Sequence, residues 1–284
     1  MIKSVHAENR PFTRTQLSKA WIGSLSILFI FTAITVIPFL APQDPYHIQM
    51  GSRLQPISTM HWLGTDHLGR DVLSRVIAGL RTTVGTSLLI LIVSLVVGVP
   101  LGLLSGFIGG WVDRVFQRVV DAFMTLPDYM FAIVLSGLLG PGLGNLIFAV
   151  SAVKWVGYAR LVRSTVLAEK QKDYIALSIL AGTSSLRIVM RHILPHAIGN
   201  VLVLSTLDIG KIILMIASLS FLGLGPQPPI PEWGTMLNEG RAYFQMAPHL
   251  MLGPGIAVVL TVLLANVCGD KLRDRYDVKT RTEE

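Results

Sequence analysis

The chain has 284 residues, of which 51% are hydrophobic and 14% charged, whereas a soluble domain of this size carries about 25% charged residues. Apolar runs of about 20 residues recur along the whole length, which excludes a soluble globular protein and predicts an all-α integral membrane protein with about six transmembrane helices. Lys and Arg exceed Asp and Glu by seven, but they lie between the apolar runs, so membrane topology explains the basic balance better than a nucleic-acid partner does.

The first 82 residues are predicted to form an anchor helix followed by a long outer loop. Residues 1–19 are polar and basic and are assigned to the cytoplasm. The apolar run over residues 20–40 is too long for the core of a signal peptide, so we interpret it as a retained first span. Residues 41–82 are assigned to the outer face. A short amphipathic helix lying on the membrane is predicted there from helically spaced apolar residues, which are Leu68, Val72, Leu73, Val76 and Leu80.

The second span is predicted over residues 83–107 and carries three glycines spaced by four. Gly98, Gly102 and Gly106 share one helix face, and a face without side chains allows another helix to approach closely. A short inner connection at residues 108–121 follows. The second span is therefore expected to pack tightly against a neighbouring helix along these glycines.

The third and fourth spans each contain a charged residue. The third covers residues 122–139, where Pro127 is expected to bend or shorten the helix just before Asp128. A glycine-rich outer turn leads to the fourth span, residues 145–159, which contains Lys154. Charged groups within a bilayer usually face the interior of a helix bundle or a wet path. Asp128 and Lys154 are therefore candidates for a translocation path.

An amphipathic segment, residues 174–195, stands between the fourth and fifth spans. Its apolar residues are helically spaced on either side of Gly182, which suits a backbone turn because it lacks a Cβ. The hydroxyl groups of the next three residues could cap the second helix, and Pro195 is expected to end or kink it. Two short helices joined by a glycine and carrying Arg187 and Arg191 indicate a docking element for a partner; an ordinary interfacial turn is the alternative.

The same segment resembles the coupling loop, often called the EAA loop, of permeases from binding-protein-dependent ABC importers. Gly182 is followed after thirteen positions by the proline of an Ile-Leu-Pro triplet, as in that signature, whereas Ala176 stands where the signature has glutamate. The resemblance implies that residues 160–195 form a cytoplasmic loop that fits a groove on an ATPase subunit. It assigns ATPase coupling to six residues, namely Ala176, Gly182, Arg187, Arg191, Ile193 and Pro195.

The last third is predicted to contain the fifth and sixth spans, over residues 198–224 and 249–267, which complete a membrane domain of residues 20–268. Residues 223–248 are assigned to an outer loop with a restricted backbone, in which residues 235–248 are expected to form a short re-entrant or surface helix. Residues 269–284 form a basic tail assigned to the cytoplasm. The inner segments then hold 17 Lys and Arg and the outer segments five, which agrees with the positive-inside rule.

Asp208 and Lys211 are the most specific candidates for a functional pair of charged residues in the predicted spans. They stand three residues apart in the fifth span, so they share a helix face and could pair with each other. Two interpretations stay open. The pair lies on a translocation path, with Asp208 attracting a cation or an ammonium group, or it is a structural ion pair against another helix or subunit. Asp128 and Lys154 are the groups that it is expected to meet across the bundle.

Further motifs are similar to the peptide/nickel branch of these permeases, and the resemblance extends over residues 20–277. They are TD-x-x-GRD-x-x-SR at 65–75, SLSFLGLG at 218–225 and PEWG at 231–234. Two others look more like nickel-permease subunits than dipeptide ones, namely TLDIG at 206–210 and LRDR at 272–275. Within the first motif, Asp66, Arg70 and Asp71 are expected to form a local ion-pair cluster that shapes the loop rather than to contact substrate.

No enzymatic motif is evident in the chain. It contains no phosphate-binding G-x-x-x-x-G-K-[ST] sequence and no H-E-x-x-H, so neither an ATPase site nor a metal site is assigned. His61 and His67 in the outer loop are weak candidates for a transient metal contact, and ordinary loop histidines are the stronger interpretation. A membrane-embedded enzyme is disfavoured because no nucleophile–base pair stands out.

The resemblance implies a permease subunit of an ABC importer in the bacterial inner membrane, with both termini in the cytoplasm. Its implied partners are a homologous permease that completes a heterodimer, two ATPase subunits that bind ATP and Mg, and an extracytoplasmic substrate-binding protein; no cofactor is expected in this chain. The implied cargo is nickel as a chelate, with di- or oligopeptides as the alternative. A secondary transporter driven by an ion gradient would need internal repeats, which are not evident.

Overall fold

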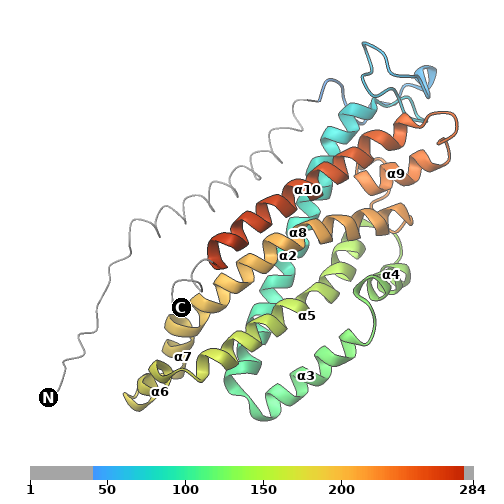
Figure 1. The fold of residues 1–284 in the computed structure, drawn as a ribbon. Coiled ribbons are helices and arrows are strands. Elements are labelled where there is room, and N and C mark those ends of the chain that lie inside the picture. The colour runs from blue at the N-terminus through green and yellow to red at the C-terminus, as the bar shows by residue number, and fades with distance from the viewer. Residues whose placement is uncertain (1–40, 278–284) are drawn as a thin grey trace.

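The structure, a computed structural model, describes residues 41–277 as a bundle of long helices (Figure 1). The N-terminal segment and the predicted first span, residues 1–40, lie outside the described residues, as do residues 278–284. The described helices are η2 Met50–Ser52, α2 Val72–Ile108, α3 Gly110–Met124, α4 Asp128–Leu139, α5 Leu143–Lys170, α6 Asp173–Leu180, α7 Ser185–Ile188, the π-helical η3 Val189–Ile193, α8 Leu194–Phe221, α9 Trp233–Arg241 and α10 His249–Asp277. Residues 41–277 contain no β-strand, and the predicted all-α fold is confirmed.

Four helices in the described part of the chain are long and apolar enough to cross a membrane. They cover Val72–Ile108, Leu143–Lys170, Ser185–Phe221 and His249–Lys271. The pair α3 and α4 passes the same test together, but the chain bends by 84° between the two helices. Pro127 stands at this break as the N-cap of α4 and lacks an N–H for a continuous helix. The predicted bend in the third span is therefore present.

The second span is longer than predicted, because α2 begins at Val72 rather than near residue 83. The side chain of Asp71 caps this start by accepting a hydrogen bond from the Ser74 backbone N–H at 2.8 Å. The prediction of a separate amphipathic helix on the membrane surface is wrong, since four of its five apolar residues form the first turns of α2 and Leu68 lies in the turn before it. Arg75, within these first turns, is buried and lies in an ion pair with Asp66.

The three spaced glycines of α2 face α5, as predicted. A Cβ on Gly98 would lie 2.6 Å from the Trp155 carbonyl oxygen, and one on Gly102 would lie 2.4 Å from that of Ala159. A Cβ on Gly106 would lie 2.8 Å from the Cβ of Val166. Because real side-chain atoms do not approach so closely, only glycine permits this packing of α2 on α5. Buried apolar residues of α2, α5 and α8 form the main core around this contact.

A short helix was predicted over residues 235–248; the structure has α9 at Trp233–Arg241, which contacts the first turns of α2. Trp233 is buried at its start and donates a hydrogen bond from Nε1 to the Val76 carbonyl at 2.8 Å. Glu232 caps α9 by accepting bonds from the backbone N–H groups of Gly234 and Thr235, at 3.0 and 2.8 Å. The Trp233 bond attaches the start of α9 to α2, and the Glu232 cap stabilises that start.

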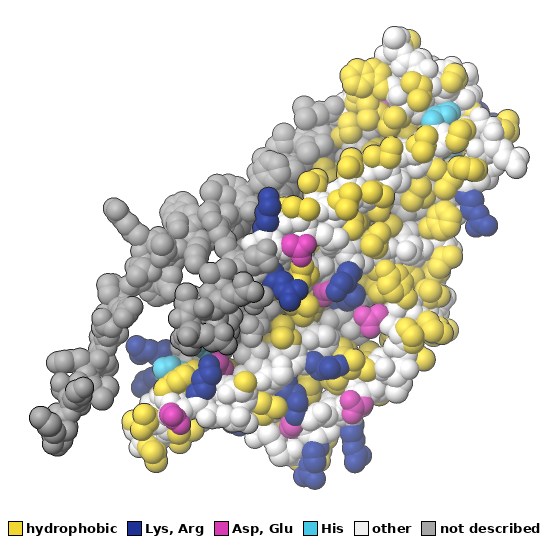
Figure 2. Space-filling model, in the orientation of Figure 1, with side chains coloured by type: hydrophobic (Ala, Val, Ile, Leu, Met, Phe, Trp, Pro, Cys, Tyr) yellow, Lys and Arg dark blue, Asp and Glu magenta, His cyan; other side chains and the backbone are white. Residues whose placement is uncertain are grey.

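Opposite ends of the bundle carry different surfaces. In Figure 1, the 41–71 segment and α9 lie at one end, and α6 and α7 lie at the other. Figure 2 shows hydrophobic side chains covering much of the upper part of the visible face, whereas charged side chains gather in its lower part, over α3, α5 and the α6–α7 end. Such an apolar band on long helices is what a bilayer requires.

Candidate functional site

The predicted docking element is a pair of short helices at one end of the molecule. α6 ends at Leu180, the chain turns at Gly182 with a φ of 75°, and α7 begins at Ser185. This φ lies in the left-handed region, which favours glycine. Ser184 occupies the N-cap position of α7, but its side chain makes no capping hydrogen bond. The two helices around the glycine are therefore present, while the expected hydroxyl cap is not formed.

Pro195 lies in the first turn of α8 and does not end the preceding helix. Residues Val189–Ile193 form a π-helical turn, and α8 begins directly afterwards at Leu194. Proline is tolerated in a first turn because the N–H that it lacks would have no partner within the helix. The expectation that Pro195 ends the helix is wrong, since Ser185–Phe221 continues as one stretch of span length, although a π-helical turn interrupts it just before Pro195.

The α6–α7 tip, residues 173–190, exposes many apolar side chains at an end where charges are frequent. The exposed ones are Leu177, Ile179, Leu180, Leu186 and Met190. Ala176, Arg187, Arg191 and Pro195 are exposed beside them. Ile175, Ile188 and Ile193 point inward and are buried in the main core, so they anchor the tip to the bundle. A cluster of exposed apolar groups with a charged rim is typical of a protein-binding surface.

A buried carboxylate fixes the tip against α5. Glu169, near the end of α5, accepts a hydrogen bond from Lys172 Nζ at 2.7 Å and another from the Tyr174 hydroxyl. Partial burial, followed by this bond to Glu169, raises the pKa of Tyr174 to about 12, so its hydroxyl stays protonated at neutral pH. The Tyr174 ring also lies 5.8 Å from that of His192 in η3. Because α6 buries only Ile175, these polar contacts contribute much of its attachment.

The four predicted path residues form two separate ion pairs, each with one largely buried and one exposed side chain. Lys154 of α5 pairs with Asp128 of α4 at 3.4 Å, and Lys211 pairs with Asp208 within α8 at 3.3 Å. The predicted Asp208–Lys211 pair is thus present. However, Asp128 and Lys154 pair with each other, and the group that meets Asp208 across the bundle is Tyr158, whose hydroxyl donates to Asp208 Oδ2 at 3.0 Å.

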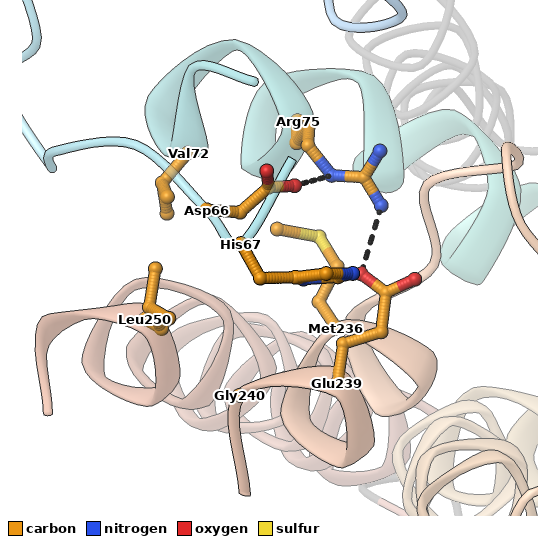
Figure 3. A pocket seen from close by; sticks show the side chains of 8 residues that line it. All are labelled: Asp66, His67, Val72, Arg75, Met236, Glu239, Gly240 and Leu250. Carbon is orange, nitrogen blue, oxygen red and sulfur yellow. Dashed lines mark hydrogen bonds and ion pairs between the residues drawn. The ribbon is translucent and has the colours of Figure 1, made fainter. Parts of the chain in front are cut away.

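The motif at residues 65–75 builds a buried ionic cluster at the opposite end of the bundle (Figure 3). Arg70 Nε lies 2.6 Å from Asp66 Oδ2, and Arg75 Nε lies 3.6 Å from the same oxygen. Glu239 of α9 accepts from Nη2 of both arginines, at 3.2 and 3.3 Å. The predicted local cluster is confirmed for Asp66 and Arg70, whereas Asp71 belongs to the α2 cap and to a pair with His61 at 2.9 Å.

This cluster does not have the electrostatics of a metal site. One ligand atom each of Asp66, His67 and Glu239 lies within 4.8 Å of the others, and His67 Nδ1 and Glu239 Oε1 have no hydrogen-bond partner among the described residues. Both carboxylates, however, are already neutralised by two buried arginines. A divalent ion would add repulsion from both guanidinium groups, so a bound water fits the two open atoms better. His67 itself stacks on Tyr243, with ring centroids 5.5 Å apart.

Three of these partners were missed by the sequence reasoning. Tyr158 carries no charge and has no motif, so nothing in the sequence singles it out. Glu232 and Glu239 could have been identified from the sequence, because they are the only acidic residues in the 223–248 segment. The 65–75 motif carries two arginines, which need acidic partners if they are buried.

Sequence comparisons place this arrangement among known transporters. The sequence model of the family described as "binding-protein-dependent transport system inner membrane component" matches residues 98–282. The nickel transport system permease protein NikC of Escherichia coli (strain K12) is 41% identical over 271 residues, which are 94% of this chain and 98% of that protein. The glutathione transport system permease protein GsiD of Pectobacterium atrosepticum is 38% identical over 283 residues, which are 99% of this chain and 94% of that protein.

Solved structures share the fold at lower sequence identity. An inward-facing form of the MetNI methionine ABC transporter has a TM-score of 0.56 at 19% identity, and it covers 71% of this chain and 95% of its own. An amino acid ABC transporter with histidines has a TM-score of 0.55 at 14% identity, over 72% and 94% of the two chains. The chain therefore belongs to the family of inner-membrane components of binding-protein-dependent transport systems, and it is a multi-pass permease subunit of an ABC importer in the nickel/peptide branch.

Proposed function

We propose that this permease carries nickel as a chelate and that ATP bound with Mg to two partner ATPase subunits drives the transport. The observation that carries the proposal is the 41% identity to a nickel transport permease over 94% of the chain. A homologous permease would complete the path as the second half of a heterodimer, and an extracytoplasmic binding protein would deliver the cargo. The chain itself would have no ATPase site.

Di- or oligopeptide cargo is the second candidate, because a glutathione transport permease is 38% identical over nearly the whole chain. Radiolabelled nickel uptake in cells lacking this gene, with dipeptide uptake measured in parallel, separates the two. Loss of nickel uptake alone, restored by the wild-type gene, supports the metal cargo. Loss of peptide uptake alone overturns it in favour of peptides. An ion-gradient mechanism would leave uptake intact when the cells are depleted of ATP but keep their membrane potential.

The α6–α7 tip is proposed to dock in a groove of the ATPase, with the 160–195 segment and both termini in the cytoplasm. Exposed apolar side chains on the tip support this assignment, because they stand where a bilayer cannot cover them if the charged end faces water. The 41–71 segment and α9 would then face the outside. Cysteine labelling of exposed positions at both ends, with a membrane-impermeant reagent, tests this orientation.

Gly182 provides a sharp test of the docking role. A Cβ placed there has no atom within 4 Å, so this chain leaves space for a larger side chain, although the φ of 75° strains any residue other than glycine. Gly182→Trp is expected to abolish ATP-driven uptake while membrane insertion is retained. Gly182→Asn is the matched control, because asparagine tolerates the positive φ and adds little bulk. Full uptake in the Trp variant, or equal loss in both variants, would refute docking at this glycine.

The path is proposed to run beside Asp128, Lys154, Asp208 and Lys211. Three of these charged groups, Lys154, Asp208 and Lys211, stand near the middle of long apolar helices, which supports the proposal because such groups are strongly disfavoured against lipid. In this role, Asp208→Asn weakens cargo flux without disrupting assembly. Unchanged flux in that variant would leave Asp208 with a structural role only.

A further inference from the structure

The junction between α5 and α6, residues 169–174, connects the α6–α7 tip to the long helices. Glu169, near the end of α5, accepts a hydrogen bond from the Tyr174 hydroxyl of the tip. The next side chain, Lys170, donates from Nζ to the Phe107 carbonyl at 2.9 Å and so caps the last turn of α2. Two adjacent residues of α5 therefore bind the tip and the end of α2.

The tip has few other contacts that could fix its direction. α6 buries only Ile175, and α7 buries only Ile188. Among the described residues, the bond from Tyr174 to Glu169 is the only side-chain hydrogen bond between residues 173–190 and the rest of the chain. Apolar burial is non-directional, whereas a hydrogen bond requires a defined angle between donor and acceptor. The orientation of the tip therefore depends on this one bond.

The surroundings of Glu169 make the bond strong. Only 8% of its side chain is exposed, and its other donor is the half-exposed ammonium group of Lys172 at 2.7 Å. His196, in the first turn of α8, also interacts electrostatically with this carboxylate. Hydrogen bonds to a charged acceptor are about twice as strong as neutral ones, and burial keeps water from replacing a lost donor.

We propose that the Glu169–Tyr174 bond transmits movement between the tip and α5 during ATP-driven transport. Glu169 is a positioning residue in this role, because it acts only by fixing the direction of the tip. A movement imposed on a docked tip then displaces the end of α5, and the bond of Lys170 to α2 makes the two helices move together. This inference rests on the proposed docking of the tip to an ATPase.

Tyr174→Phe tests the inference, because it removes only the hydroxyl and keeps the ring that lies 5.8 Å from that of His192. The complete transporter, with its second permease, ATPases and binding protein, is reconstituted in proteoliposomes. Uptake of radiolabelled nickel and of radiolabelled glycylglycine is measured together with ATP hydrolysis. Cargo taken up per ATP is expected to fall about tenfold, as loss of one charge-assisted contact implies, while hydrolysis continues at a rate close to that of the wild type.

An unchanged ratio of uptake to hydrolysis overturns the inference. Equal falls in uptake and hydrolysis also overturn it, because the bond would then only anchor the tip. Ser178→Ala is the matched control, since it removes another hydroxyl of α6, whose bond to the Tyr174 carbonyl at 2.7 Å stays within that helix. The control should keep the wild-type ratio, and an equal fall in the control counts against the inference.

Glu169→Gln changes the other side of the bond, since the amide keeps the size of the side chain but lacks the charge. The ratio of uptake to hydrolysis should fall in this variant as well. If the two residues act through one bond, the variant with both changes should lose less than the product of the two single losses. Losses that multiply overturn the inference, because the two residues would then act separately.

The outcome is separable from the proposed function. If the wild type takes up either cargo with ATP and Gly182→Trp abolishes uptake, but Tyr174→Phe keeps the wild-type ratio, only the role of the Glu169–Tyr174 bond fails. If wild-type uptake needs no ATP, or if Gly182→Trp leaves it at full rate, the proposed ATP-driven mechanism or the proposed docking fails, whatever Tyr174→Phe shows.

Discussion

Replacing Gly102 by alanine adds one methyl group at the closest point between α2 and α5. The new Cβ would lie 2.4 Å from the Ala159 carbonyl oxygen and 2.9 Å from the Val162 Cβ, whereas ordinary contacts begin at 3.4 Å. The helices must therefore separate locally by up to about 1 Å, because a backbone carbonyl cannot rotate away as a flexible side chain can. Overpacking of this kind costs about 1–3 kcal/mol, and we expect the upper half of that range for Gly102→Ala.

Gly85→Ala is the matched control on the same helix, because a Cβ there has no atom within 4 Å. Alanine favours a helix over glycine by about 1 kcal/mol, so this control should leave stability unchanged or raise it. Thermal unfolding of the purified protein in one lipid or detergent system compares the two variants. Equal destabilisation by both changes, or none by Gly102→Ala, would refute the idea that α2 and α5 are held at glycine distance.

Three further changes probe contacts between elements, each by the free energy of unfolding. Trp233→Phe keeps most of the buried area but removes the bond to the Val76 carbonyl, and we expect a loss of about 1 kcal/mol. Asp113→Asn removes the carboxylate that Arg163 holds at 2.5 and 2.7 Å, so α3 should detach from α5 at a loss of about 2 kcal/mol, seen as faster hydrogen exchange in α3. Glu239→Gln leaves two buried arginines with one carboxylate and should destabilise by about 3 kcal/mol, while a loss below that of Trp233→Phe would contradict the cluster's importance.

Periodic features of the sequence predicted the fold well. The glycines spaced by four identified the α2 face that meets α5, and Gly182 marked the turn between α6 and α7. Both predictions rest on a property that glycine alone has, the absence of a Cβ. Pro127 likewise marked the break between α3 and α4. Where a structural feature requires one particular residue type, the local sequence is sufficient to predict that feature.

Predictions failed where tertiary contacts decide what a polar residue does. A surface helix was predicted around Arg75, but the side chain of Arg75 is buried in α2 against Asp66 and against Glu239, which lies more than 160 residues later. The sequence predicted a helix end at Pro195. Instead, a π-helical turn precedes this proline and places it in the first turn of α8, and no sequence signal marks such a turn. The partner of Asp208 across the bundle was missed for the same reason, since a tyrosine in an apolar run usually serves packing.

The contacts of α5 explain how the two proposed sites could act on each other. Its middle carries Lys154, which pairs with Asp128, and Tyr158, which donates to Asp208, and its end carries Glu169, which accepts a hydrogen bond from Tyr174 of the tip. Glycine-distance packing against α2 leaves α5 little freedom to bend. A displacement of the tip that keeps the Glu169 contacts must therefore move α5 as a rigid body or break the contacts of Lys154 and Tyr158. Either response changes the arrangement of charged groups along the proposed path.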